Sequence, residues 1–241
     1  MNRHALLIGN LDAVGAQNDI NNWKKFLRSG VGGAWNQNEI EVLINPSKVL
    51  LESRLFLIKA TAYDFVFVVY AGHGGWQRST ILEINPQYET ISETQLKGLA
   101  PREILTLDCC RGTSTTADVL NEAQLRMFSE TTRSTIRARY DTRMMAASPQ
   151  QVTLYACSIG ESAYCTNDGG YYTRNLIRQS AAVPANGYRT INLAHSAAAP
   201  ATTREVATKE NQDQHPDIAA VRCLYSQQLI IGIDTSVFRI Y

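Results

Sequence analysis

Apolar residues recur along the chain in two alternating patterns, which predict strands and helices that follow one another. Short apolar runs that end in glycine or in a polar turn are typical of buried strands. Such runs cover residues 5–9, 39–44, 64–71, 103–107, 151–156 and 227–233. Apolar residues spaced three or four positions apart predict helices at 16–29, after Ser47 and at 171–180. This alternation indicates an α/β sheet with helices on both faces.

Three segments carry weaker patterns. Residues 80–85 are expected to form a short hairpin arm, and residues 92–98 a short helix. Residues 113–150 are rich in Thr, Ser and Arg and weakly periodic, with a helical pattern only at 117–128. No repeat or low-complexity block divides the 241 residues, so we expect a single domain.

Composition and charge exclude several classes of protein. Lys plus Arg total 23 and Asp plus Glu total 22, so the charge gives no reason to expect a nucleic-acid partner. The longest apolar run, 65–71, is far shorter than the ~20 residues of a membrane helix, and the run at 5–8 is too short for a signal peptide. Five cysteines without such a signal favour free thiols. We therefore expect a cytoplasmic protein with no membrane partner.

Two of the predicted strands end in reactive side chains. His73 follows strand 64–71 inside a glycine-rich turn, and Cys110 follows strand 103–107 and Asp108. Ligands of parallel sheets bind beyond the carboxyl ends of the strands, and neighbouring strands lie ~4.8 Å apart. An imidazole beside a thiol can take its proton, or hold a thiolate whose pKa falls below its usual ~8.5. Gly74 could offer a backbone N–H to an oxyanion hole.

Plainer explanations exist for each of these residues. A lone histidine is often a satisfied core or surface residue, and a lone cysteine is often a small buried hydrophobe. The turn 71–75 could also bind phosphate. However, the chain lacks a Gly-x-Gly-x-x-Gly fingerprint after its first strand and a Walker-type Gly-Lys-Ser/Thr, which disfavours a nucleotide-binding domain. Because both reactive residues follow strong apolar strands beside glycines, nucleophilic catalysis is the favoured hypothesis.

The order of these motifs resembles that of caspase-like cysteine peptidases (peptidase family C14), which include metacaspases, paracaspases and orthocaspases. Residues 71–74 read Ala-Gly-His-Gly and 107–112 read Leu-Asp-Cys-Cys-Arg-Gly. Arg-Gly after the nucleophile is the caspase pattern, and Asp two residues before it is the metacaspase pattern, so both select Cys110 over Cys109. Weaker matches follow in the expected order at 6–10, 17–20, 155–163, 170–176 and 214–216. Ala71 and Arg111 depart from the Ser and His that are usual in metacaspases.

The resemblance implies a caspase-like three-layer α/β/α sandwich around a mostly parallel six-stranded sheet. One peptidase domain would span 1–241, with a large-subunit-like part at 1–112, an intersubunit-type linker at 113–150 and a small-subunit-like part at 151–241. His73 and Cys110 would form the catalytic dyad, with Gly74 and Cys110 in the oxyanion hole. The substrates would be proteins or peptides.

The resemblance also implies a pocket for the residue before the cleaved bond, at positions that here are Asp19 and Asp108. Two carboxylates favour a cationic side chain, and a bidentate arginine more than a lysine, whereas a substrate aspartate would be repelled. A helix N-terminal cap is the plainer role of Asp19, and a hydrogen bond that stiffens the cysteine loop is that of Asp108. Ser158, Glu161 and Asp168 are further polar candidates for the same cleft.

The linker 113–150 corresponds to a segment that caspase-like peptidases often cut in themselves. Its plainer role is that of a solvated linker. It contains no lysine and five arginines: Arg126, Arg133, Arg137, Arg139 and Arg143. No dense acidic cluster marks a calcium site, so no cofactor is assigned and calcium activation stays open. A separate activator protein, and a role in cell death, antiviral defence or housekeeping, are compatible with the family. The alternative to a peptidase is a masked or catalytically silent module that binds or regulates.

Overall fold

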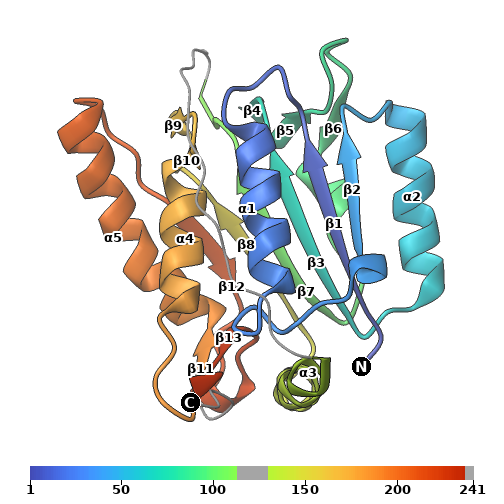
Figure 1. Cartoon of the computed structure of the whole chain (residues 1–241). Coiled ribbons are helices and arrows are strands. Elements are labelled where there is room, and N and C mark those ends of the chain that lie inside the picture. Colours follow the sequence, from blue (N-terminus) through green and yellow to red (C-terminus); the bar gives the residue numbers. More distant parts are fainter. Residues whose placement is uncertain (113–129, 237–241) are drawn as a thin grey trace.

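A six-stranded sheet forms the centre of the structure, a computed structural model that describes residues 1–112 and 130–236 (Figure 1). The strand order is β12-β8-β7-β3-β1-β2, parallel throughout except for β12, which pairs antiparallel with β8. These strands are β1 (Arg3–Gly9), β2 (Ile40–Ile44), β3 (Phe65–Ala71), β7 (Arg102–Asp108), β8 (Gln150–Tyr155) and β12 (Asp217–Ala220). The predicted mostly parallel six-stranded sheet is confirmed.

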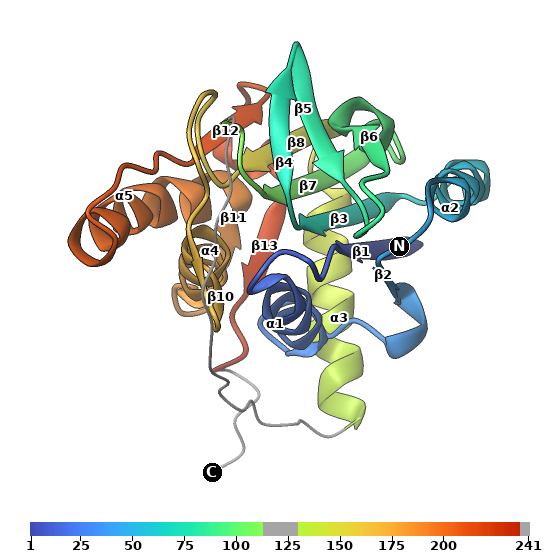
Figure 2. The ribbon, with the colours of Figure 1, turned by 90° about the horizontal axis from the view of Figure 1, so that it is seen from above.

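Alternate residues of the central strands point to opposite faces, so the sheet has two cores. On one face, residues such as Leu7 and Phe67 pack under four helices: α1 (Ala16–Arg28), α3 (Glu130–Met145), α4 (Tyr171–Ala181) and α5 (Ile191–Lys209). On the other face, residues such as Leu6 and Val68 pack under one helix and a small sheet: α2 (Lys48–Thr61), β4 (Gly74–Gln77), β5 (Ser79–Glu83) and β6 (Thr90–Ser92). Figure 2 shows α1, α4 and α5 on one side of the sheet and β4–β6 on the other. The expected three layers are present.

The local sequence explains most of these elements. The apolar face of α1 buries Ile20, Trp23 and Leu27 at the spacing that the sequence predicts. The Ser47 hydroxyl caps α2 by accepting a hydrogen bond from the backbone N–H of Leu50 at 3.3 Å. Among the described helices, none combines the length and the apolar character that crossing a membrane requires.

The final predicted strand has a different position from the one expected. It corresponds to β13 (Ile230–Ile233), which pairs with β11 (Tyr188–Thr190) in a separate two-stranded sheet, so β12 takes the sixth place in the main sheet. The expected hairpin arm is part of the β4–β6 sheet, and the short helix is a 3-10 turn at Glu93–Leu96. The remaining short elements are η1 (Gln37–Glu39), β9 (Cys165–Thr166), β10 (Gly169–Gly170) and η3 (Tyr225–Gln227).

Two helices were not expected from the sequence. In α5 most buried positions are occupied by small or polar residues such as Ala194, His195 and Thr202, which give only a weak apolar pattern, and Pro200 lies within the helix. In α3 the stripe of Ile136, Tyr140 and Met144 is buried but lies among arginines. The helix predicted at 117–128 falls outside the described residues.

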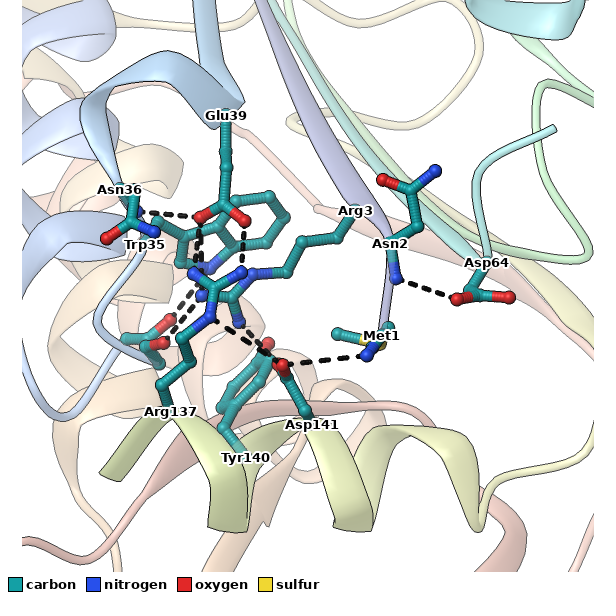
Figure 3. Close-up of polar contacts among 12 residues, drawn as sticks. Met1, Asn2, Arg3, Trp35, Asn36, Glu39, Asp64, Arg137, Tyr140 and Asp141 are labelled. Atoms are coloured by element: carbon teal, nitrogen blue, oxygen red, sulfur yellow. Dashed lines mark hydrogen bonds and ion pairs between the residues drawn. The ribbon is translucent and has the colours of Figure 1, made fainter. Parts of the chain in front are cut away.

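Helix α3 is fastened to the first strand by the buried side chain of Arg3 (Figure 3). The guanidinium pairs with Asp141 of α3 at 2.9 Å and with Glu39 at 3.6 Å. It also stacks on the Trp35 ring at 4.3 Å and on the Tyr140 ring at 5.6 Å. The C-terminal part of the predicted linker is therefore an integral part of the folded body.

Candidate active site

His73 and Cys110 lie at the same level of two neighbouring strands. β3 and β7 are adjacent and parallel, and Ala71 is in register with Asp108. Each reactive residue stands two positions after this pair, so both lie just beyond the carboxyl edge of the sheet. The backbone N–H of Gly72 donates to the carbonyl of Asp108 at 3.1 Å, which ties the two turns together.

One pocket at this edge contains both reactive residues and both predicted carboxylates. It has a volume of about 50 Å³ and is lined by Ala13, Val14, Ala16, Asp19, Gly72, His73, Asp108, Cys109, Cys110, Ala163 and Cys165. Within the described chain, Ser158, Glu161 and Asp168 are not part of this lining. The pocket is smaller than the ~300–1,000 Å³ of sites that hold a whole ligand.

Cys110 is the accessible member of the cysteine pair. Cys109 is 3% exposed and packs in the core under β4, whereas Cys110 is half-buried and its Sγ donates to the carbonyl of Ala163 at 3.7 Å. Burial raises the pKa of the Cys110 thiol, against the opposite effect of hydrogen bonds with Ala163 and Ser162. The direction of this shift is opposite to the one expected from the sequence for a thiol beside an imidazolium. In the described structure no hydrogen bond joins Cys110 to the His73 ring.

The His73 turn is supported from the core by Tyr70. The buried phenol hydroxyl of Tyr70 donates to the carbonyl of His73 at 2.6 Å and also contacts the carbonyl of Glu83. The same His73 carbonyl accepts the backbone N–H of Glu83 at 3.0 Å. The backbone position of His73 is therefore set by a fully buried residue, which the sequence did not single out.

Gly74 packs directly against the cysteine turn. A side chain at this position would collide with Sγ of Cys109 at 2.8 Å and with the carbonyl of Cys110 at 2.9 Å. Only glycine permits this close approach. Gly74 thus lies beside the nucleophile candidate, as an oxyanion-hole residue must, although it does not line the pocket itself.

Asp19 and Asp108 both point their carboxylates at the N-terminus of α4. Both oxygens of Asp19 accept the backbone N–H of Gly170, at 2.9 and 3.1 Å. Oδ2 of Asp108 accepts the backbone N–H of Thr173 at 3.2 Å and its hydroxyl at 2.6 Å. Side chains on Gly169 or Gly170 would overlap these carboxylates. The N-terminal end of a helix dipole favours such negative charge.

These two carboxylates share an electrostatically strained site. Burial, and next the charge of Asp108, raise the pKa of Asp19 well above its usual range. Burial also raises the pKa of Asp108, against the opposing bonds from Thr173 and the charge of Arg174. The α1 cap is Gly15, without a side-chain bond, so Asp19 binds the end of α4 instead of capping its own helix.

Comparisons with known proteins identify the family and the fold. A family model of the caspase domain, of peptidase family C14, matches residues 2–224. The chain belongs to this caspase-domain peptidase family. The structure is similar to that of caspase-1 from Spodoptera frugiperda, with a TM-score of 0.58 and 13% identity over 90% of this chain and 86% of that one. It is also similar to protein GSU0716 from Geobacter sulfurreducens, with a TM-score of 0.54 and 13% identity over 95% and 97%. No curated protein sequence matches the chain.

In this caspase-domain protein, Gln214 supports one wall of the pocket. The sequence indicated this residue only through a short motif. Gln214 is fully buried, and its side chain accepts the backbone N–H of Tyr164 at 2.9 Å and donates to the carbonyl of Ala156 at 2.7 Å. It therefore fixes the segment that carries Ala163 and Cys165. The Gln-x-Pro signal at 214–216 marked the position but not the role.

The other polar candidates of the sequence support neighbouring loops. Glu161 pairs with the ring of His215 at 2.7 Å, and the Ser158 hydroxyl donates to the carbonyl of His215 at 2.9 Å. Asp168 lies 3.8 Å from Arg174. Their contacts connect the loop after β8 and the turn between β9 and β10 to the rest of the fold.

Proposed function

We propose that this chain is a cysteine endopeptidase that cleaves after a basic residue, arginine before lysine, with Cys110 as nucleophile and His73 as base. One observation supports the proposed preference for a basic residue. The carboxylates of Asp19 and Asp108 line the same small pocket as Cys110 and His73. A residue held in this pocket has its own carbonyl within reach of the thiol.

The proposed chemistry begins with the transfer of a proton from the Cys110 thiol. His73 takes the Cys110 proton as the thiol attacks the substrate carbonyl, and the backbone N–H groups of Gly74 and Cys110 stabilise the oxyanion. The imidazolium then returns the proton to the departing amine, which leaves a thioester on Cys110. Water, deprotonated by His73, hydrolyses the thioester and restores the free thiol.

The electrostatics of the pocket supports a cationic substrate. Burial and mutual repulsion disfavour joint ionisation of the two carboxylates, against the opposing charge of Arg174, and a bound guanidinium reduces this penalty further. The carboxylates come from a helix and a strand end, so they can bind two edges of one planar guanidinium, which an ammonium group cannot match. An aspartate in the same place adds a third negative charge.

Self-processing of the linker is part of the proposal. The contacts of α3 reduce the candidate cleavage sites to one arginine. Arg133 donates to the carbonyls of Arg28 and Trp35 at 3.0 Å, and Arg137 pairs with Glu39. Cleavage after an arginine of α3 requires local unfolding of that helix, because peptidases bind extended chains. The remaining candidate is Arg126, which lies outside the described residues.

A masked or silent module is the second candidate, and the small pocket is the observation that favours it. A thiol-reactive peptide that ends in an arginine ketone distinguishes the two. The peptidase proposal predicts one covalent adduct at Cys110, located by mass spectrometry, and none in Cys110→Ala. If Cys109 or Cys165 is labelled instead, the assignment of the nucleophile is wrong. A separate activator, calcium activation and a role in cell death or defence rest on the family alone.

A further inference from the structure

The ring of His73 faces two carboxylates that the proposed mechanism does not use. Asp12 lies in the loop after β1, and Glu83 ends β5. One ligand atom of each, together with a ring nitrogen of His73, forms a trio in which all atoms lie within 4.8 Å of one another. Within the described chain, neither the His73 ring nor the Asp12 carboxylate has a hydrogen-bond or ion-pair partner.

Buried groups hold these three segments at a fixed spacing. The side chain of Asn10, which is fully buried, donates to the carbonyl of Glu83 at 2.9 Å and accepts the backbone N–H of Asp12 at 3.1 Å. The hydroxyl of Tyr70 contacts the carbonyls of both His73 and Glu83. The three ligand groups therefore lie close together because buried contacts fix their backbones. Their proximity is not only a chance meeting of charged side chains on a surface.

The donor set selects the kind of ion. One imidazole nitrogen with two carboxylates suits Zn²⁺ and its neighbours such as Co²⁺, whereas Ca²⁺ takes six to eight oxygen ligands. Bonds of about 2.0–2.2 Å in a tetrahedral site hold ligand atoms roughly 3.3–3.5 Å apart. The ligand atoms lie within 4.8 Å of one another, so they need to approach by up to about 1.5 Å. Rotation of the exposed Asp12 side chain and of the partly buried His73 and Glu83 side chains allows this approach.

We propose that Asp12, His73 and Glu83 form a binding site for Zn²⁺ or a similar divalent cation, and that the bound ion inhibits the enzyme. An imidazole that coordinates the ion through one ring nitrogen carries a proton on the other, so neither nitrogen can take the proton of Cys110. The inhibitory consequence rests on the proposed peptidase function, whereas the binding site itself does not.

Calorimetry with the full-length Cys110→Ala protein tests the site without any need for activity. Zinc chloride should bind with one ion per chain, and the absorption spectrum of added Co²⁺ should report nitrogen and oxygen ligands. Because loss of an outer-shell group alone costs about 10–100-fold in metal affinity, Asp12→Asn and Glu83→Gln should each weaken binding by at least ~10-fold. His215→Asn, which removes the other exposed histidine–carboxylate pair, should leave the affinity unchanged.

Three results would overturn the proposal. The first is an unchanged affinity in both Asp12→Asn and Glu83→Gln, with circular dichroism showing intact folding. The second is zinc binding that needs Cys110 and is lost in Cys110→Ala, which assigns the ion to the thiols. The third is an active enzyme that zinc binds at this trio without inhibiting. If the chain cleaves no peptide, the proposed function fails, but calorimetry still shows whether Asp12, His73 and Glu83 bind the ion. The two failures can therefore be distinguished.

Discussion

Replacement of Asp108 by Asn should separate activity from stability. The asparagine Oδ1 can accept both hydrogen bonds from Thr173 that the aspartate accepts now, so the change removes one charge and little packing. Loss of one carboxylate facing a buried guanidinium typically costs about 2–5 kcal/mol, which corresponds to roughly 30- to 5,000-fold in kcat/KM for an arginine substrate. The free energy of unfolding should stay within about 1 kcal/mol of the wild-type value or rise.

The pH dependence gives the sign of the stability change. Because burial raises the folded-state pKa of Asp108 above its unfolded value, the folded state binds more protons, and the wild type loses stability as pH rises through that window. The Asn variant lacks this loss, so the difference in unfolding free energy should favour it increasingly from acid to neutral pH. Urea unfolding at several pH values, alongside kcat/KM, measures both effects. Equal loss of stability and activity, or unchanged cleavage after arginine, would refute the reasoning.

The remaining predictions concern the framework around the site. Arg3→Met should lower the unfolding free energy by about 3 kcal/mol and the melting temperature by ~6–12 °C. The expected loss is at the low end for a broken buried ion pair, because Arg137 still contacts both carboxylates. A change below 1 kcal/mol would contradict this prediction. Tyr70→Phe should lower kcat by ~10-fold with little change in KM, and an unchanged kcat would remove its positioning role. Burial raises the pKa of Glu103 to about 7, so wild-type stability should fall by about 3 kcal/mol between pH ~4.5 and ~7 relative to Glu103→Gln; parallel pH curves would exclude this effect.

The helices and strands could be predicted where large apolar side chains form the helical or strand pattern in the sequence. The strand that ends before His73 is a continuous β-branched and aromatic run, and the strand that ends before Cys110 contains the apolar run Ile104–Leu107 with one threonine. Helix α5 could not be predicted, because the buried positions between Ile191 and Val206 are occupied by Ala, His and Thr. Helix α3 was obscured by arginines, which serve here as partners of Glu39, Asp141 and backbone carbonyls.

The candidate site could be predicted to the level of residue identity but not of geometry. The motifs selected Asp19 and Asp108, yet nothing local indicated that both would face the N-terminus of α4, because that contact joins segments over 60 residues apart. The raised pKa of the Cys110 thiol also depends on tertiary burial. The pocket itself also depends on tertiary structure, because its lining combines residues of α1 with Ala163 and Cys165.

Cleavage of a matched set of fluorogenic peptides, which differ only in the residue before the bond, tests the central claim most directly. The wild type should cleave after arginine faster than after lysine, and after both faster than after aspartate by orders of magnitude in kcat/KM. Cys110→Ala should abolish all cleavage, and His73→Ala should lower it by at least ~10²-fold. Preferred cleavage after aspartate, or full activity in Cys110→Ala, would contradict the account.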